Sequence, residues 1–177
     1  MTTALLIIDV QQALCSGEYE CFEIARVINT INDLSTRARN AGVPVVLIQH
    51  EEANGPFTYS AAGWQLAEGL ETEPKDLCVR KTTGDSFYQT NLQKLLPEQD
   101  FERLVICGLQ TDYCVNATVR QALKLGYDVV LAADAHSTVD NGNFTAEDII
   151  AEHNKDWAHL TGSVARIDVI LAAEIRF

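Results

Sequence analysis

The chain of 177 residues is 47% hydrophobic and 21% charged, which is typical of a globular protein with a buried core. Its formal net charge of −12 opposes binding to nucleic acid or to an anionic membrane and weakly favours neutral or cationic ligands. No apolar run has the length of a membrane span. We therefore expect a single domain over residues 1–177 whose partner is a small-molecule substrate.

The first ten residues, MTTALLIIDV, lack the basic residues and the uninterrupted apolar run of a secretory signal. The chain has five cysteines, an odd number, and two of them, Cys78 and Cys107, lie inside apolar runs. No C-x-x-C or C-x-x-H pair suggests zinc. This pattern favours reduced thiols in a cytoplasmic protein over a disulfide framework.

Apolar strands and amphipathic helices are predicted to alternate along the chain. Strands are expected over 4–10, 43–50, 76–81, 103–108, 127–135 and 163–170, and helices with their breakers over 23–42, 90–102, 115–126 and 145–160. In the first helix one face carries Ile24, Ile28, Ile31, Leu34 and Ala38. Gly42 then ends this helix, and Pro44 prevents its continuation.

The predicted strands are rich in Val, Ile and Leu and show no alternation with polar residues. Such strands, separated by helices, are typical of a parallel sheet that is covered on both faces. The sequence therefore predicts an α/β protein, a three-layer αβα sandwich with a mainly parallel sheet of about six strands. Neither G-x-G-x-x-G nor G-x-x-x-x-G-K-[ST] is present, so we do not expect a dinucleotide- or NTP-binding protein.

Residues 51–76 form a long irregular segment between two predicted strands. Loops of this length in a compact domain are usually functional or cover a site. We expect this segment to hold much of the substrate specificity.

Three reactive side chains follow predicted strands. Asp9 ends the first strand, Lys81 follows LCV, and Cys114 opens the helix after LVIC. Ligands of open parallel sheets bind beyond the carboxyl ends of the strands, so an acid, a cation and a thiol meet at one end of this sheet. Each also has a simpler interpretation, because Cys is often a small core residue, Asp a cap and Lys a solvated charge.

The stretch GLQTDYCV gives the thiol a special position. If Thr111 is the N-cap, Cys114 is the third helical residue, where free backbone N–H groups and the helix dipole favour a thiolate. Lys81 acts in the same direction, and Asp9 can take the proton. We therefore predict a lowered thiol pKa.

The residues around these side chains resemble the isochorismatase-like cysteine hydrolases. The similar stretches are IIDVQ around Asp9, VRKTTGDSF around Lys81 and GLQTDYCVNATVRQALKLGYDVVLAADA around Cys114, in order from about residue 4 to 135. The resemblance implies a Rossmann-like sheet that carries an Asp–Lys–Cys triad. In it Cys114 is the nucleophile, Asp9 is the general base and acid, and Lys81 holds both anions.

The resemblance also implies an oxyanion hole of backbone N–H groups at Gln110 and Cys114, and a cis peptide between Leu109 and Gln110. The implied activity is hydrolysis of an amide, ureide or lactam C–N bond through a Cys114 thioester, without a cofactor. The implied assembly is a homodimer or homotetramer.

Two family patterns are absent. Members that cleave the vinyl ether of isochorismate lack the cysteine, so Cys114 favours amide-type chemistry. Nicotinamidases carry a D-x-H metal motif after the second strand, where this chain reads LIQHEEANG. We therefore expect no metal. The aromatic residue often found five positions after the base is Leu14 here.

Several further residues are candidates for substrate binding by their place near the predicted site. The aromatic candidates Trp64 and Phe87 have core or interface packing as the alternative interpretation. His153 and Trp157 lie four residues apart on the last helix and predict a buried or subunit-facing stripe. The candidate substrate-binding residues are Gln11, Leu14, His50, Trp64, Phe87, Tyr113 and His136.

Alternative functions remain open on the sequence alone. One is an isochorismatase-type hydrolase of another small metabolite. Another is a thiol redox protein that uses Cys114, against which no resolving cysteine is evident, although Cys15 follows Asp9 shortly in sequence and could approach the site. A third is a non-catalytic ligand-binding or scaffold protein, against which the intact Asp9, Lys81 and Cys114 argue.

Overall fold

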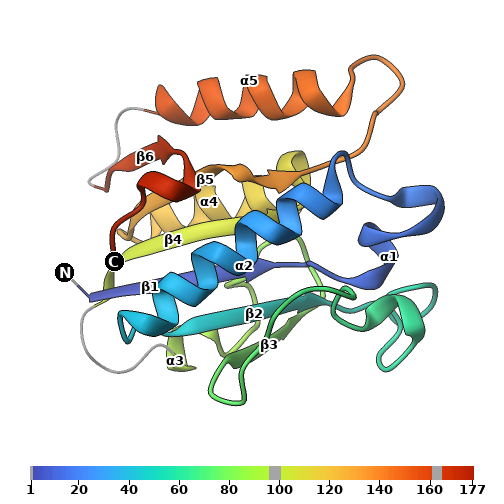
Figure 1. Cartoon of the computed structure of the whole chain (residues 1–177), viewed down its shortest axis with the longest axis horizontal. Coiled ribbons are helices and arrows are strands. Elements are labelled where there is room, and N and C mark those ends of the chain that lie inside the picture. Colours follow the sequence, from blue (N-terminus) through green and yellow to red (C-terminus); the bar gives the residue numbers. More distant parts are fainter. Residues whose placement is uncertain (1, 96–100, 161–164) are drawn as a thin grey trace.

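A computed structural model describes residues 2–95, 101–160 and 165–177 (Figure 1). Six parallel strands form one sheet in the order β3-β2-β1-β4-β5-β6. This sheet, with helices on both faces, confirms the predicted αβα sandwich. The strands are β1 (Thr2–Ile8), β2 (Val45–His50), β3 (Leu77–Lys81), β4 (Phe101–Leu109), β5 (Asp128–Ser137) and β6 (Ile167–Ile170).

Helix α2 covers one face of the sheet, and α4 lies behind the opposite face (Figure 1). No helix in the described part of the chain combines the length and the hydropathy that a bilayer-spanning segment requires. The helices are α1 (Gln12–Cys15), α2 (Ile24–Asn40), α3 (Leu92–Leu95), α4 (Asn116–Lys124) and α5 (Ala146–Ala158), with 3-10 turns at Gly17–Tyr19, Ala62–Trp64 and Ala172–Glu174 and a π-helical turn at Thr111–Val115.

Strand β1 is buried on both faces, which explains its unbroken apolar sequence. Leu5 and Ile7 pack into the core beneath α2, whereas Leu6 and Ile8 pack into the core on the α4 face. The predicted apolar face of α2 is buried throughout. This helix ends as expected at Gly42, which has a φ of 72° that favours glycine.

Several predicted boundaries differ from the structure, and the main differences concern one helix and two strands. The helix expected within 90–102 is seen only as α3, Leu92–Leu95, and residues 96–100 lie outside the described ranges. Strand β4 begins at Phe101, two residues before the predicted start, because its pairing with β1 extends back to Thr2. The last strand is described from Ile167, and residues 161–164 lie outside the described part.

Gly108 of β4 lies against Ile8 of β1, its partner in the sheet register. Its φ is 114°, a conformation that L-residues rarely adopt. A Cβ at this position would overlap the backbone of Ile8. Only glycine therefore permits the close approach of β1 and β4 just below the carboxyl end of the sheet.

The irregular segment 51–76 is tied to the rest of the fold by polar contacts. Its last residue, Asp76, forms a buried two-pronged ion pair with Arg39 of α2, with N–O distances of 2.8 and 3.0 Å. Asn32 donates from its side chain to the carbonyl of Gly69 at 2.8 Å. These contacts hold the later part of the segment against the C-terminal half of α2.

Candidate active site

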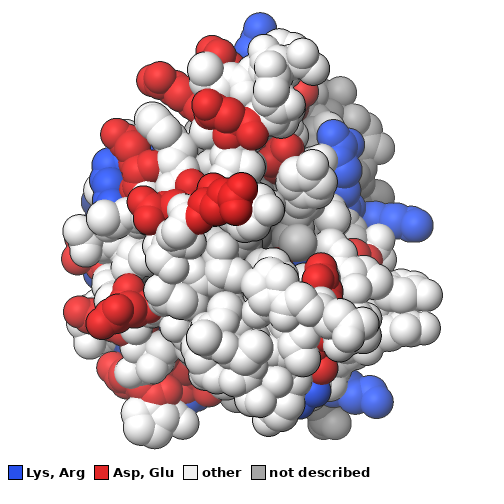
Figure 2. All heavy atoms as spheres, turned by 90° about the vertical axis from the view of Figure 1, so that its right-hand side faces the viewer, with Lys and Arg blue, Asp and Glu red and all other residues white. Residues whose placement is uncertain are grey.

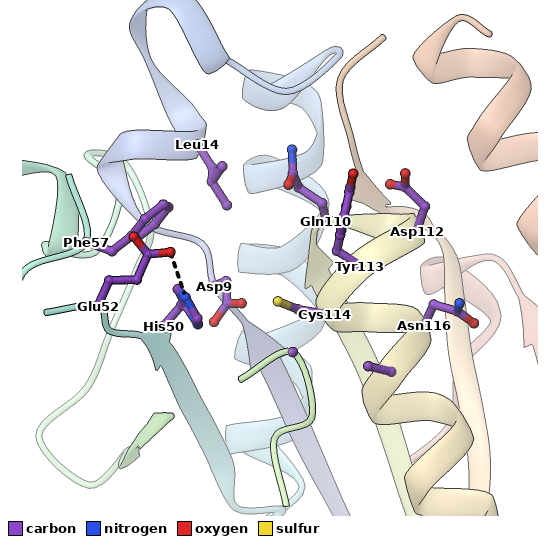
Figure 3. Close-up of a pocket in the computed structure, with 12 residues that line it drawn as sticks. Asp9, Leu14, His50, Glu52, Phe57, Gln110, Asp112, Tyr113, Cys114 and Asn116 are labelled. Atoms are coloured by element: carbon purple, nitrogen blue, oxygen red, sulfur yellow. Dashed lines mark hydrogen bonds and ion pairs between the residues drawn. The ribbon is translucent and has the colours of Figure 1, made fainter. Parts of the chain in front are cut away.

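A pocket of about 530 Å³ opens at the carboxyl ends of the central strands. Asp9 and Cys114 lie at its floor, where the carboxylate and the sulfur point toward each other (Figure 3). The pocket lies beyond the carboxyl ends of the parallel strands, where the sequence predicted that a ligand binds.

Lys81 connects the two reactive groups of the floor. Its Nζ donates to Oδ2 of Asp9 at 2.7 Å and to Sγ of Cys114 at 3.2 Å. The third N–H has the carbonyl of Thr83 as its acceptor at 3.1 Å. An ammonium group has three donors, and all three are used, so this buried cation is held in one position. The three residues predicted as a triad are thus in contact.

Asp9, Lys81 and Cys114 are each positioned by a different element of the fold. Asp9 directly follows β1 in the left-handed conformation, with a φ of 49°, which an Asp tolerates better than most residues. Lys81 is the last residue of β3 and reaches past β2 to Asp9. Cys114 lies in the π-helical turn that precedes α4, and this turn begins after Gln110.

The predicted N-cap was wrong by one residue. The cap is Gln110, and the backbone N–H groups of Tyr113 and Val115 donate to its carbonyl at 3.2 and 3.1 Å. Thr111 is buried, and its hydroxyl is engaged with His136. Local sequence could not show this, because the preference for Thr as a cap is overridden by its tertiary contact.

The predicted thiolate is also not what the structure favours. Burial and the Asp9 carboxylate raise the pKa of Cys114 to about 12, although Lys81 acts in the opposite direction. For Lys81, burial alone would lower the pKa, but Asp9 and Cys114 together outweigh it and the pKa is raised. The resting site therefore holds an ammonium beside a neutral thiol. The sequence could not reveal how deeply the thiol is buried.

Oδ1 of Asp9 is the open acceptor of the site. It is buried and has no hydrogen-bond donor among the described residues. The Asp9 carboxylate lies close enough to Cys114 to raise the thiol pKa. Oδ1 is therefore available to take a proton from Cys114 or to accept an N–H from a ligand.

The peptide bond between Leu109 and Gln110 is cis, as predicted. Gln110 and Cys114 both line the pocket, and Figure 3 shows both across the cavity from Glu52 and His50. Their assignment as the two oxyanion donors stays a prediction.

Three of the seven candidate substrate-binding residues line the pocket: Leu14, His50 and Tyr113. Gln11 does not line it. Its side chain is buried and is bonded to the backbone of His50 at 2.8 and 3.0 Å and to the carbonyl of Trp64 at 2.8 Å. Gln11 therefore supports the wall of the pocket from behind.

Trp64 and Phe87 are also placed elsewhere. Trp64 lines a separate cavity with Arg80 and packs edge-on against Tyr59, at a ring-centroid distance of 4.9 Å. Phe87 is buried in the core of the α4 face and stacks on Tyr127 at 5.9 Å. Phe87 therefore follows the packing interpretation, because its large apolar surface is buried against another ring, whereas Trp64 is half-buried at the wall of the other cavity.

His136 was expected at the edge of the site but is a buried core residue. Nδ1 lies 2.9 Å from the hydroxyl of Thr111, and Nε2 lies 2.9 Å from Oδ1 of Asn154, so Nε2 carries the proton. Its ring packs edge-on against Trp157, which is fully buried and also contacts His153. The predicted stripe of His153 and Trp157 is therefore buried at its Trp157 end.

Burial lowers the pKa of His136 to about 4, so the fold contains a neutral imidazole that an unfolded chain would protonate below pH 6.5. Since the unfolded state then binds more protons, stability should fall as the pH falls from 6.5 to 4, by about 2–3 kcal/mol from this residue. Urea unfolding at pH 7 and 4.5 should show a smaller loss in His136→Gln than in wild type. The exposed His159→Gln should keep the wild-type loss, and equal losses in all three proteins would contradict the assignment.

Six pocket residues were not predicted: Glu52, Phe57, Gly84, Asp112, Asn116 and Ala117. Glu52 and Phe57 belong to the segment 51–76 that was expected to carry specificity, while Asp112 and Asn116 flank the thiol on the helical side. Asp112 stands in the quoted stretch TDYC, next to a predicted pocket residue, so its place in the sequence was a usable signal. Glu52 and Phe57 had no signal beyond their segment, because an irregular loop has no side-chain periodicity.

The described residues include no group of three or more His, Cys, Asp or Glu side chains placed to hold a metal ion. His50 stands in the region where nicotinamidases carry the D-x-H metal motif. Its Nε2 lies 3.2 Å from Oε1 of Glu52.

The family model of the isochorismatase domain matches residues 3–166. The chain therefore belongs to the isochorismatase family, as the resemblance predicted. It is 43% identical to a streptothricin hydrolase of Streptomyces noursei over 141 residues, which cover 77% of this chain and 50% of that enzyme. The chain thus spans about half the length of this relative.

Two further comparisons agree with this membership. The chain is 28% identical to the ureidoacrylate amidohydrolase of Pseudomonas savastanoi pv. phaseolicola over 170 residues, covering 75% of this chain and 69% of that protein. A crystal structure of an isochorismatase family protein matches with a TM-score of 0.85 and 36% identity, covering 94% of this chain and 98% of that one.

Proposed function

We propose that this protein hydrolyses a C–N acyl bond, in an amide, ureide or lactam of a small molecule, with Cys114 as the nucleophile. The observation that carries the proposal is Nζ of Lys81, which contacts both Oδ2 of Asp9 and Sγ of Cys114 at the floor of a pocket. The names of the two enzymes it resembles, a streptothricin hydrolase and a ureidoacrylate amidohydrolase, support hydrolysis and, for the second, an amide bond.

In the first half of the reaction the thiol proton passes to Oδ1 of Asp9 as the sulfur attacks the acyl carbon. The carbonyl oxygen becomes an oxyanion, which the backbone N–H groups of Gln110 and Cys114 stabilise. The C–N bond then breaks, Asp9 returns its proton to the leaving nitrogen, and ammonia or an amine departs. Cys114 is left as a thioester.

In the second half a water molecule attacks the thioester while Asp9 takes one of its protons. The C–S bond breaks, the acid product leaves, and the sulfur recovers a proton from Asp9. Each turn therefore consumes one water and restores the neutral thiol. A single carboxylate acts alternately as base and acid, which matches one open oxygen on a buried Asp9.

The raised pKa of Cys114 fits this scheme. A neutral resting thiol needs a base at the moment of attack, and Asp9 is in place for that task. Lys81 remains protonated, and because it contacts both partners it stabilises the negative charge on whichever of them carries it. The proton thus moves within a cluster whose total charge is constant.

A thiol redox function is less well supported. Oxidation by peroxide follows thiolate character, whereas burial and Asp9 hold Cys114 in the neutral form. Cys15, the sequence candidate for a second thiol, is not among the residues that line the pocket. Burial raises the pKa of Cys15 to about 12 as well.

The direct test is acid quenching of the enzyme during turnover of small amides, ureides and lactams that release ammonia, in buffer containing EDTA. Mass spectrometry of the Cys114 peptide should then show the mass of the acyl group, lost again after hydroxylamine treatment. Ammonia release without any acylated Cys114, under conditions that trap a chemically prepared thioester, would contradict covalent catalysis by this residue.

A further inference from the structure

Three carboxylates and no Lys or Arg are among the residues that line the pocket in the described part of the chain. Lys81 lies behind the floor, with its three N–H groups already engaged. On the face that carries the carboxyl ends of the strands, acidic side chains are spread widely and most basic ones lie at the margins (Figure 2). A ligand in the pocket therefore meets an excess of negative charge.

Asp112 is held as one of these carboxylates on the helical side of the pocket. The hydroxyl of Thr138 donates to its Oδ1 at 2.6 Å. This contact fixes the side chain without neutralising it, because Thr138 carries no charge. Figure 3 shows Asp112 on the α4 side of the pocket, across the cavity from Glu52.

Glu52 is the carboxylate of the opposite wall. His50 approaches its Oε1 at 3.2 Å through Nε2. Nδ1 of the same ring is buried and has no partner among the described residues, so a second proton there would lack an acceptor. A ring that donates from Nε2 to Glu52 satisfies this geometry.

The floor gives independent evidence for a ligand that donates hydrogen bonds. Asp9 is 1% exposed, and its Oδ1 has no hydrogen-bond donor within the described ranges. A buried carboxylate oxygen without a donor is costly unless a bound group supplies one. Between floor and rim, Leu14 and Phe57 add apolar wall. The cavity thus combines an unpaired hydrogen-bond acceptor at its floor, apolar side chains in the middle and carboxylates at its rim.

We propose that the substrate carries a cationic group as well as the scissile amide-type bond, and that Asp112 and Glu52 select it. This inference rests on the proposed function for the scissile bond, but not for the charge preference. With the carbonyl carbon at Cys114, an ammonium or guanidinium group lies toward the rim, where the two carboxylates flank the cavity. An anionic acyl compound meets repulsion at the same place.

The charge preference can be measured without any substrate, by using Cys114 as the probe. Two methanethiosulfonates of similar size, trimethylammonioethyl (cationic) and sulfonatoethyl (anionic), transfer their thioalkyl group to a thiolate and release methanesulfinate. Their rates at Cys114 and at the exposed Cys78 are read in one sample by peptide mass spectrometry. The cation-to-anion ratio of rates should be at least about tenfold higher at Cys114 than at Cys78.

The variants Asp112→Asn and Glu52→Gln should each lower the Cys114 rate with the cationic reagent by about threefold and raise that with the anionic one by about as much. Asp33→Asn, an equal charge change at an exposed residue of α2, should leave both rates unchanged. A Cys114 ratio equal to that of Cys78, or one that the double variant does not reduce, would overturn the proposal.

A turnover comparison separates this inference from the proposed function. 6-Aminohexanamide, hexanamide and adipamate share one chain length and differ in charge. The kcat/KM for ammonia release should fall in that order, and Asp112→Asn should reduce it for 6-aminohexanamide only. Equal rates for all three would overturn the substrate class and leave the hydrolase standing. A preserved reagent ratio with no cleavage of cationic amides, ureides or lactams would count against the hydrolase instead.

Discussion

Replacing Cys114 with alanine is expected to lower turnover by at least about 10⁴-fold, because the proposed reaction has no route around the thioester. The fold should survive, since the sulfur lies at a cavity wall, where water can accept the Lys81 N–H that loses its partner. Ammonia release measures the first effect, and urea unfolding the second.

The matched control is Cys78→Ala, which removes an exposed thiol from the edge strand β3. It should retain wild-type turnover. If Cys114→Ala kept a tenth of the activity while Cys78→Ala behaved as wild type, the nucleophile would have to be sought elsewhere in the pocket.

Replacing Asp9 with asparagine should change turnover and thiol reactivity in opposite directions. Turnover should fall by about 10²–10⁴-fold, because the base that takes the thiol proton is lost. The pKa of Cys114 should fall as well, since the Asp9 carboxylate raises it and Lys81 remains to stabilise the thiolate. Alkylation of Cys114 by iodoacetamide at pH 7–8 should therefore be faster in Asp9→Asn than in wild type.

The exposed Cys78 serves as the reference thiol in the same digest. Lys81→Met should shift the alkylation profile of Cys114 to higher pH, because the buried thiolate then has no cation beside it. Slower alkylation in Asp9→Asn would mean that the carboxylate promotes the resting thiolate. The proposed neutral resting state would then be wrong.

The parts of this protein that could be predicted are those set by the backbone. The unbroken apolar runs indicated buried parallel strands, and a parallel sheet brings all its carboxyl ends to one edge. This argument alone placed Asp9, Lys81 and Cys114 together, although 72 residues separate the first two. The family resemblance added the cis peptide before Gln110, which no periodicity indicates.

The walls of the pocket followed no such rule. Trp64 and Phe87 have residue types that suit a pocket, yet the positions of their neighbours decide that they pack elsewhere. Glu52 comes from an irregular segment, so only the folded chain shows that it faces Asp112 across a cavity. The prediction of a lowered thiol pKa was wrong for a related reason. The position at the start of a helix favours a thiolate, but burial beside Asp9 outweighs this effect and raises the pKa of Cys114.

Gly108 shows that a residue can control the chemistry without approaching the substrate. It sits opposite Ile8, one residue before Asp9, and its own strand leads within two residues to Gln110. Any side chain there would push β1 from β4, and the gap between Asp9 and Cys114, the proposed base and nucleophile, would widen with it. In the proposed mechanism, Gly108 thus sets the separation between the group that gives the proton and the group that takes it. We expect substitutions of Gly108 to appear among inactive variants together with those of Asp9, Lys81 and Cys114, although glycine has no reactive side chain.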